Sequence, residues 1–155
     1  MEIKPGIGIG TIHFGMTAEE IAELMQLENH PRDESISASK DGANQLLEFA
    51  GHGLAFELYA DESFRLCSIG VRGSGYKLFG RDIYGMPKSV VKRHLLRSAN
   101  EIPKDENYSL RGSSKFECLD YDRLGLLIWL LDGNVTHLDL SVWYEPDNET
   151  IIWPA

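Results

Sequence analysis

The sequence predicts an α+β fold made of two copies of one unit, a helix followed by three antiparallel strands. The first observation is a repeated opener: Phe14-Gly15-Met16-Thr17 recurs about seventy residues later as Tyr84-Gly85-Met86-Pro87. The second is a strand pattern entered through Gly-Leu in each half, at Gly53-Leu54 and Gly125-Leu126. A further short strand closes each half, over residues 64–71 and 135–142. Two copies of so long a period are typical of one pseudo-symmetric domain rather than a solenoid.

We expect a single domain over residues 1–155, which is an ordinary length for one hydrophobic core. Repeat 1 covers about 5–72, repeat 2 about 76–145, and a C-terminal tail 146–155. One helix and three strands cannot cover a sheet alone, so the halves should share a core. The expected architecture is an antiparallel sheet of about six strands with both helices on one face.

The first helix is predicted from its N-terminal signal. Thr17 and Glu20 form a capping box, in which each side chain bonds the backbone N–H of the other residue. Apolar residues then recur at three-and-four spacing, which predicts a helix from about Ala18 to Leu27.

The second helix begins near Pro87, whose fixed φ suits the first helical turn. It should end before Asn100, because Ile102-Pro103 disfavours α geometry. Its apolar stripe consists of Val90, Val91, His94 and Leu95. The stretch 29–44 is polar and is predicted to be a loop, with a short edge strand as the alternative.

The strands alternate between two faces with a period of two. The face predicted to contact the helices carries Leu54, Phe56, Leu58, Cys67, Ile69, Val71, Leu126, Ile128, Leu130, Leu138, Leu140 and Val142. The other face carries Leu66, Ser68 and Gly70 in the first half, and Leu127, Trp129, Leu131, His137, Asp139, Ser141 and Trp143 in the second. A tight turn is expected in the segment 131–135, where Gly and Asn tolerate positive φ.

The net charge is −9, which argues against nucleic acid and anionic membranes as partners. Residues 101–155 hold eleven acids and four bases, so most of the net negative charge lies in this segment. No apolar run is long enough to span a membrane, and the N-terminus does not resemble a secretory signal. These features predict a cytoplasmic protein, in which Cys67 and Cys118 are thiols rather than a disulfide.

The sequence gives no indication of a catalytic, cofactor-binding or metal-binding site. The glycine-rich segment Pro5–Gly10 is not followed by the Lys of a phosphate loop. No histidine lies at metal-ligand spacing from another His or Cys. Although His137, Asp139 and Ser141 share a strand face, alternate residues lie about 7 Å apart, too far for a hydrogen-bonded triad. We therefore expect a non-enzymatic protein without cofactors.

The outer face of the second half is the predicted binding surface, because Trp is enriched at interface hot spots and acids speed association. The alternative is that the tail segment Ile151-Ile152-Trp153 folds back and covers this face. The predicted partner-binding residues are Asp120, Asp122, Trp129, Asp139, Trp143, Tyr144, Glu145 and Asp147.

The segment Gly10–Ile21, which contains Phe14-Gly15-Met16-Thr17, resembles the opener of small bacterial helix–sheet repeat proteins. Tandem copies resemble the arrangement of the β-lactamase inhibitory protein, and single copies resemble the BamE-type outer-membrane assembly lipoproteins. This chain lacks the lipoprotein signal and its lipidated Cys, which argues against the BamE role. Tandem units in an acidic chain also resemble immunity proteins of bacterial toxin systems.

The resemblance implies an immunity protein that binds and neutralises a cognate bacterial toxin. A basic nuclease domain is the natural target for such a charge, because acids can occupy the site where phosphates would bind. The alternatives are a structural or regulatory interaction module, including a homodimer through the aromatic face, and a small-ligand-binding protein or enzyme.

Overall fold

The computed structural model describes residues 1–27, 36–40 and 44–155, and in these residues the chain is an α+β protein. Helix α1 spans Ala18–Leu27 and helix α2 spans Lys88–Ala99. The strands of the first half are β1 (Glu2–Lys4), β2 (Gly8–Ile9), β3 (Ile12–His13), β4 (Ile36–Lys40), β5 (Asn44–Phe49), β6 (Leu54–Tyr59) and β7 (Arg65–Val71). Those of the second half are β8 (Lys77–Leu78), β9 (Arg81–Asp82), β10 (Asp105–Arg111), β11 (Ser114–Tyr121), β12 (Leu126–Leu131), β13 (Asn134–Ser141), β14 (Trp143–Tyr144) and β15 (Ile151–Ile152).

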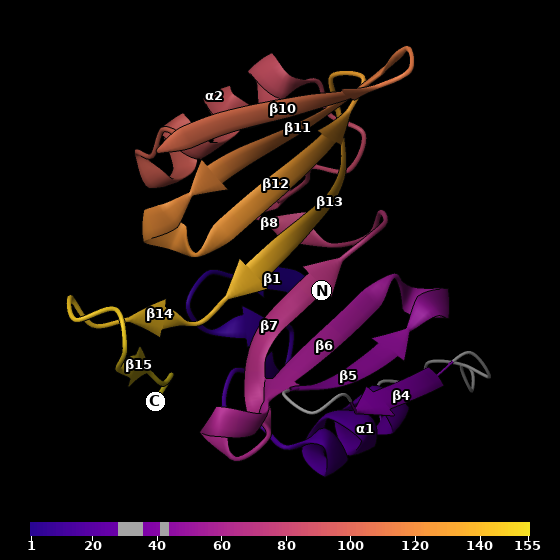
Figure 1. Cartoon of the computed structure of the whole chain (residues 1–155), viewed down its shortest axis with the longest axis vertical. Helices are drawn as coiled ribbons and strands as arrows, with labels where there is room; N and C mark the ends of the chain where they lie inside the picture. The colour runs from indigo at the N-terminus through magenta and orange to yellow at the C-terminus, as the bar shows by residue number, and fades with distance from the viewer. Residues whose placement is uncertain (28–35, 41–43) are drawn as a thin grey trace.

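The main sheet has the order β10-β11-β12-β13-β7-β6-β5-β4, and all of its neighbouring strands are antiparallel (Figure 1). The two halves meet where β7 pairs with β13 at its centre. A smaller mixed sheet has the order β3-β2-β1-β8-β9, in which β1 and β8 are parallel. Strands β14 and β15 form a separate hairpin.

The main sheet has eight strands among the described residues, whereas the sequence predicted about six. The two added strands, β4 and β10, lie at its edges. β4 lies within the polar stretch 29–44, which was predicted to be a loop or, alternatively, to contain a short edge strand. β10 is exposed along its whole length, so no alternation of buried and exposed residues could have indicated it.

The predicted start of α1 is confirmed. The backbone N–H of Thr17 donates to Glu20 Oε2 over 2.8 Å, and the N–H of Glu20 donates to Thr17 Oγ1 over 3.4 Å. In the second helix Pro87 is the N-cap, one position earlier than predicted. That helix ends at Asn100, which adopts a left-handed conformation and donates its N–H to the Leu96 carbonyl.

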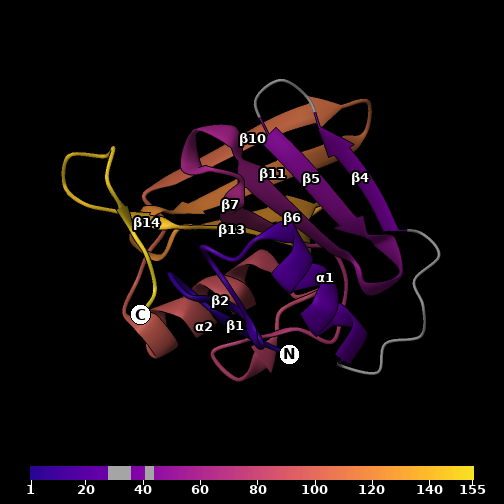
Figure 2. The same ribbon diagram turned by 90° about the horizontal axis from the view of Figure 1, so that it is seen from below.

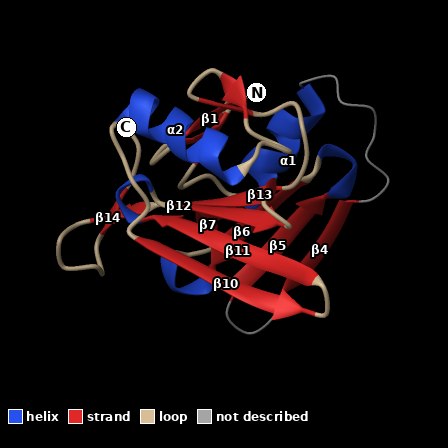
Figure 3. Ribbon diagram, turned by 90° about the horizontal axis from the view of Figure 1, so that it is seen from above, coloured by secondary structure: helices blue, strands red, loops and turns tan. Residues whose placement is uncertain are grey.

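Both helices and the smaller sheet lie on one side of the main sheet, as Figures 2 and 3 show. The side chains between these layers form one hydrophobic cluster to which both halves contribute. The other side of the main sheet, called the open face below, is covered by neither α1, α2 nor the smaller sheet.

Each half contains a β-bulge between its last two strands. In the first half, Leu58 pairs with Leu66 and Glu57 pairs with Ser68, which leaves Cys67 as the extra residue. The prediction that Leu66 faces the open side is therefore wrong, since Leu66 is fully buried. The bulge shifts the alternation by one residue, which a strict period of two cannot anticipate.

The two openers make matching backbone hydrogen bonds to the main sheet. In the first half, Gly15 N–H donates to the Leu66 carbonyl, and Leu66 N–H donates to the Met16 carbonyl. The second half has the same pair of bonds, which join Gly85 and Met86 to Val135. Each half also has a short 3₁₀ helix that ends at a left-handed glycine, Gly53 or Gly125.

Candidate functional site

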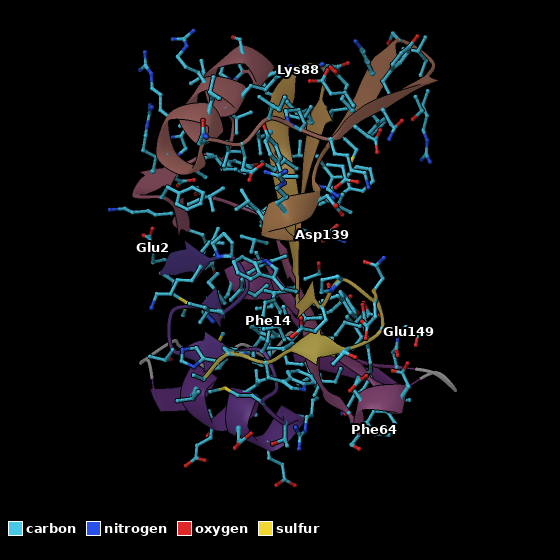
Figure 4. The ribbon with its side chains drawn as sticks, turned by 90° about the vertical axis from the view of Figure 1, so that its left-hand side faces the viewer. Glu2, Phe14, Phe64, Lys88, Asp139 and Glu149 are labelled. Carbon is cyan, nitrogen blue, oxygen red and sulfur yellow. The ribbon has the colours of Figure 1, made fainter. Side chains whose placement is uncertain are left out.

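On the open face of the second half, six of the partly exposed side chains lie next to one another on three adjacent strands, β11, β12 and β13. They form two rows across the strands, Cys118–Trp129–His137 and Asp120–Leu127–Asp139. We call these six residues the open-face patch. Figure 4 shows its member Asp139 at the level where the two halves of the molecule meet.

Trp129 is held in one orientation by two neighbours on β13. Its ring stacks on His137, with centroids 5.6 Å apart and an angle of 11° between the planes. Its Nε1 donates a hydrogen bond of 2.9 Å to Asp139 Oδ2. Because the indole is already ordered, a partner that packs on it would lose little side-chain entropy.

A β-bulge places His137 on this face. Trp129 pairs with His137 and Leu130 pairs with Val135, so Thr136 is the extra residue. Thr136 Oγ1 donates to the Trp129 carbonyl over 3.4 Å and lies 3.2 Å from His137 Nδ1. Since Val135 points into the core, strict alternation would also turn residue 137 inward, and the bulge reverses this.

The patch is negatively charged. Burial raises the pKa of Asp120, the neighbouring Asp122 raises it further, and Lys104 opposes them. Burial also raises the pKa of the Cys118 thiol, with smaller contributions from Asp120 and Asp139. In contrast, burial lowers the pKa of His137, although Asp139 acts in the opposite direction. The carboxyl groups of Asp120 and Asp139 make this surface acidic, and the lowered pKa of His137 favours a neutral imidazole beside them.

An open groove of about 490 Å³ lies at the end of β12 next to the patch. Four of the predicted partner-binding residues line it, Asp120, Asp122, Trp143 and Tyr144. Its other lining residues are Arg123, Gly125, Leu126, Leu127, Ser141, Val142, Asn148 and Ile152. Asp120 and Leu127 belong to both the groove and the open-face patch, so the two features are continuous.

Alternation along one strand predicted that Trp143 and Trp129 share a face. The structure shows that they do not. The main-sheet strand β13 ends at Ser141, and Trp143 belongs to the separate β14–β15 hairpin. Its ring packs on Gly6, where a Cβ atom would lie only 2.6 Å from the ring. Its Nε1 donates to the Leu124 carbonyl over 3.0 Å. Trp143 is still 37% exposed, so it both joins segments of the fold and lines the groove.

The last three predicted residues lie in or beside the β14–β15 hairpin. Tyr144 pairs with Ile151 in the hairpin and is exposed. Glu145 is exposed and makes backbone hydrogen bonds within the turn. Asp147 accepts hydrogen bonds from the Thr150 hydroxyl and from the N–H groups of Thr150 and Glu149, and in this order these bonds lower its pKa. Asp147 therefore has a structural role in this turn, where Figure 4 labels Glu149.

The C-terminal tail contacts the first half of the molecule. Trp153 packs on Gly15, and the Arg65 guanidinium lies 5.8 Å from its ring centroid. Ile152 pairs with Trp143 in the hairpin. The alternative was that the tail covers the outer face of the second half. The tail does contact Trp143, through Ile152, but Trp153 packs against the first opener instead.

The structure brings together Asp120, Trp129 and Asp139 on the open face, and it joins them to Asp122, Trp143 and Tyr144 through the groove. Glu145 and Asp147 are not among the groove residues. His137 and Cys118 were not predicted as site residues. The sequence predicted His137 on the same face as Trp129, but considered it as a functional residue only within a catalytic triad.

Within residues 1–27, 36–40 and 44–155, no group of three or more His, Cys, Asp or Glu residues is arranged to hold a metal ion. Both cysteines are free thiols. No described helix is long and apolar enough to cross a membrane. Comparison with protein-family models, curated proteins and solved structures found no match to this chain.

Proposed function

We propose that this chain is a non-enzymatic binding protein that presents the open-face patch and the adjoining groove to a protein partner. The observation that carries the proposal is the ordered Trp129 indole, stacked on His137 and flanked by Asp120 and Asp139 on a partly exposed sheet face. Interface hot spots commonly combine such an aromatic anchor with a polar rim.

We also infer that the scaffold is a tandem repeat with helices on one face, each unit being a helix and four strands. The matching bonds of the two openers, the paired bulges and the two glycine-ended 3₁₀ helices support this inference. The pairing of β7 with β13 is also symmetric about the pair Gly70–Asp139.

The repeat inference shows where the halves have diverged. Positions Glu57, Ser68 and Gly70 of the first half correspond to Trp129, His137 and Asp139 of the second. Function is expected where duplicated units differ, because their common residues maintain the fold. The correspondence therefore supports the open-face patch as the functional surface.

Among binding proteins, an immunity protein that neutralises a cognate bacterial toxin agrees best with the charge and the opener. Residues 101–155 hold eleven acids and four bases, a net charge of −7 out of the total −9, and Asp120, Asp122 and Asp139 lie on the patch or in the groove. A basic partner such as a nuclease domain would be attracted by this potential, and its association would be fast.

A test uses the product of a toxin gene found directly upstream of the gene for this chain. The full chain should bind that product and protect cells that express it. Trp129→Ala should raise the dissociation rate and cost about 2 kcal/mol in binding, as hot-spot truncations do. Asp120→Lys should slow association, and the effect should shrink at high salt.

The matched control is Glu48→Lys, which makes the same change of charge at the corresponding position of the first half. It should leave binding and protection close to wild type. If Trp129→Ala and Asp120→Lys bind normally, the partner uses another surface. If the wild-type chain neither binds nor protects, the immunity assignment is wrong.

A further inference from the structure

Strand β10 (Asp105–Arg111) is an edge strand with all seven of its residues exposed. Figure 1 shows it as the outermost strand at the upper end of the main sheet. Tyr108 and Leu110 are 68% and 66% exposed, which is high for large apolar side chains. Exposed edges pair with other strands unless charges block them, and the central segment Asn107–Leu110 carries no charge.

The β10–β11 hairpin determines which backbone groups of β10 face this open edge. Arg111 pairs with Ser114 across the turn Gly112-Ser113, and Gly112 has a φ of +63°. Residues that flank a two-residue hairpin turn exchange both of their hydrogen bonds, and bonded pairs then alternate along the strands. Glu106, Tyr108 and Leu110 accordingly direct their N–H and C=O groups away from β11.

We propose that a second copy of this chain pairs with β10 in antiparallel fashion, about a two-fold axis at Tyr108. Tyr108 is the middle residue of the strand, so this register overlaps its full length. It uses both outward backbone groups of Glu106, Tyr108 and Leu110 in each copy. A shift by two residues in either direction would leave residues at one end of β10 without a partner.

The side chains of β10 are complementary in this register. The opposed pairs are Tyr108 with Tyr108, Asn107 with Ser109, Glu106 with Leu110 and Asp105 with Arg111. Arg111 of each copy thus faces Asp105 of the other, and no two like charges are opposed. Glu106 does not add an unbalanced charge, since Lys88 and Lys92 already pair with it.

The dimer would join the two main sheets into one continuous sheet. Antiparallel pairing about an axis perpendicular to a sheet keeps equivalent faces on the same side. The open-face patches of both copies would then lie on one surface, so the dimer could bind a partner at two places. The patches themselves lie on β11, β12 and β13 and are not used by the contact.

Sedimentation equilibrium of the full chain, from about 1 μM to about 1 mM, tests the proposal over the range expected for a small contact. Wild type should form dimers within it. Arg111→Asp should raise the dimer Kd roughly tenfold or more, because two attractive pairs become repulsive. The double variant Asp105→Arg/Arg111→Asp should restore dimerisation, and Arg97→Asp on exposed α2 surface is the control for net charge.

Tyr108→Pro is an independent variant. It removes an N–H that faces the open edge and keeps the bonds to β11, so it should abolish the dimer. Circular dichroism shows whether Tyr108→Pro has folded. If it has not, Arg111→Asp and the double variant Asp105→Arg/Arg111→Asp test the proposal. A monomer throughout the concentration range overturns the proposal. So does a dimer that Arg111→Asp does not weaken, or one that the double variant fails to restore. These measurements need no partner, so their failure is separate from failure of the proposed function.

Discussion

Gly6 illustrates how one residue joins distant parts of this chain. It adopts a φ of +75°, and the Trp143 ring occupies the space where its side chain would lie. A residue with a Cβ is strained at this φ and would also displace the indole. The contact therefore anchors the β14–β15 hairpin to the turn between β1 and β2.

Gly6→Ala should lower the free energy of unfolding by about 2 kcal/mol or more. The matched control is Gly80→Ala, because Gly80 has a similar φ of +79° and no atom near its Cβ position. The control should cost only the backbone strain, about 1 kcal/mol. Urea denaturation measures both, and equal losses would show that the Trp143 contact adds nothing.

His137 is the one histidine of the open-face patch. Burial lowers its pKa, Asp139 raises it, and Arg72 lowers it. Its pKa in the folded protein should therefore lie below the ordinary value of about 6.5. Because the unfolded chain then binds more protons, neutral His137 contributes stability above about pH 6.5, and this contribution is lost as the pH falls through the folded pKa.

An NMR titration of the His137 ring tests this assignment. Asp139→Asn should lower the pKa of His137 further, and its amide oxygen can still accept the Trp129 hydrogen bond. Arg72→Gln should raise the pKa, because it removes a nearby positive charge. A wild-type pKa above 6.5 would mean that Asp139 outweighs burial.

At the scale of elements, Lys88 connects helix α2 to the main sheet. Lys88 Nζ lies 2.7 Å from Glu117 Oε2 on β11 and 3.4 Å from Glu106 Oε2 on β10. Glu117 is only 7% exposed and also lies 3.6 Å from Lys115 Nζ. The hydrogen bond from Lys88 is the main reason that the pKa of Glu117 is lowered.

Lys88→Met should destabilise the protein by about 1–2 kcal/mol at pH 7, because a buried carboxylate loses its closest partner while Lys115 remains. Lys104→Met is the control, since Lys104 pairs with Asp122 at the surface and should cost close to nothing. The contribution of Glu117 is present above the unfolded pKa of about 4.3 and is lost as the pH falls through the lower folded pKa. Urea denaturation at pH 7 and pH 3 measures these differences, and losses equal for the two variants would contradict this role of Lys88.

At the scale of the whole molecule, the two halves share one hydrophobic cluster and one sheet. Leu140 pairs with Ile69 across the centre, and both are fully buried. Neither half can therefore lose its structure without exposing apolar surface of the other.

Unfolding should occur in one cooperative transition. Trp129 reports on the second half, whereas Trp153 packs on Gly15 in the first. Single-Trp variants that retain either residue should give the same urea midpoint by fluorescence, and both should match circular dichroism. Two separated midpoints would mean that the halves unfold independently.

Local signals in the sequence were sufficient for the helices and for one turn. The capping box at Thr17 and Glu20 forms as predicted, because it depends only on residues three apart. The hairpin turn expected in the segment 131–135 is confirmed, but positive φ occurs at Asp132 and Gly133 rather than at Asn134, which begins β13. All twelve predicted inner-face residues are buried, because alternation is a property of each strand.

The sequence by itself thus determined the two helices, the buried faces of β6, β7, β12 and β13, and the acidic, aromatic character of residues 101–155. Tertiary structure alone decided the edge strands, the bulge that turns Leu66 inward, and the departure of Trp143 from the face of Trp129. The physical reason is the range of the interactions. Caps and periodicity depend on neighbours along the chain, whereas strand pairing and the contact between Gly6 and Trp143 join residues far apart in sequence, where no local pattern records them.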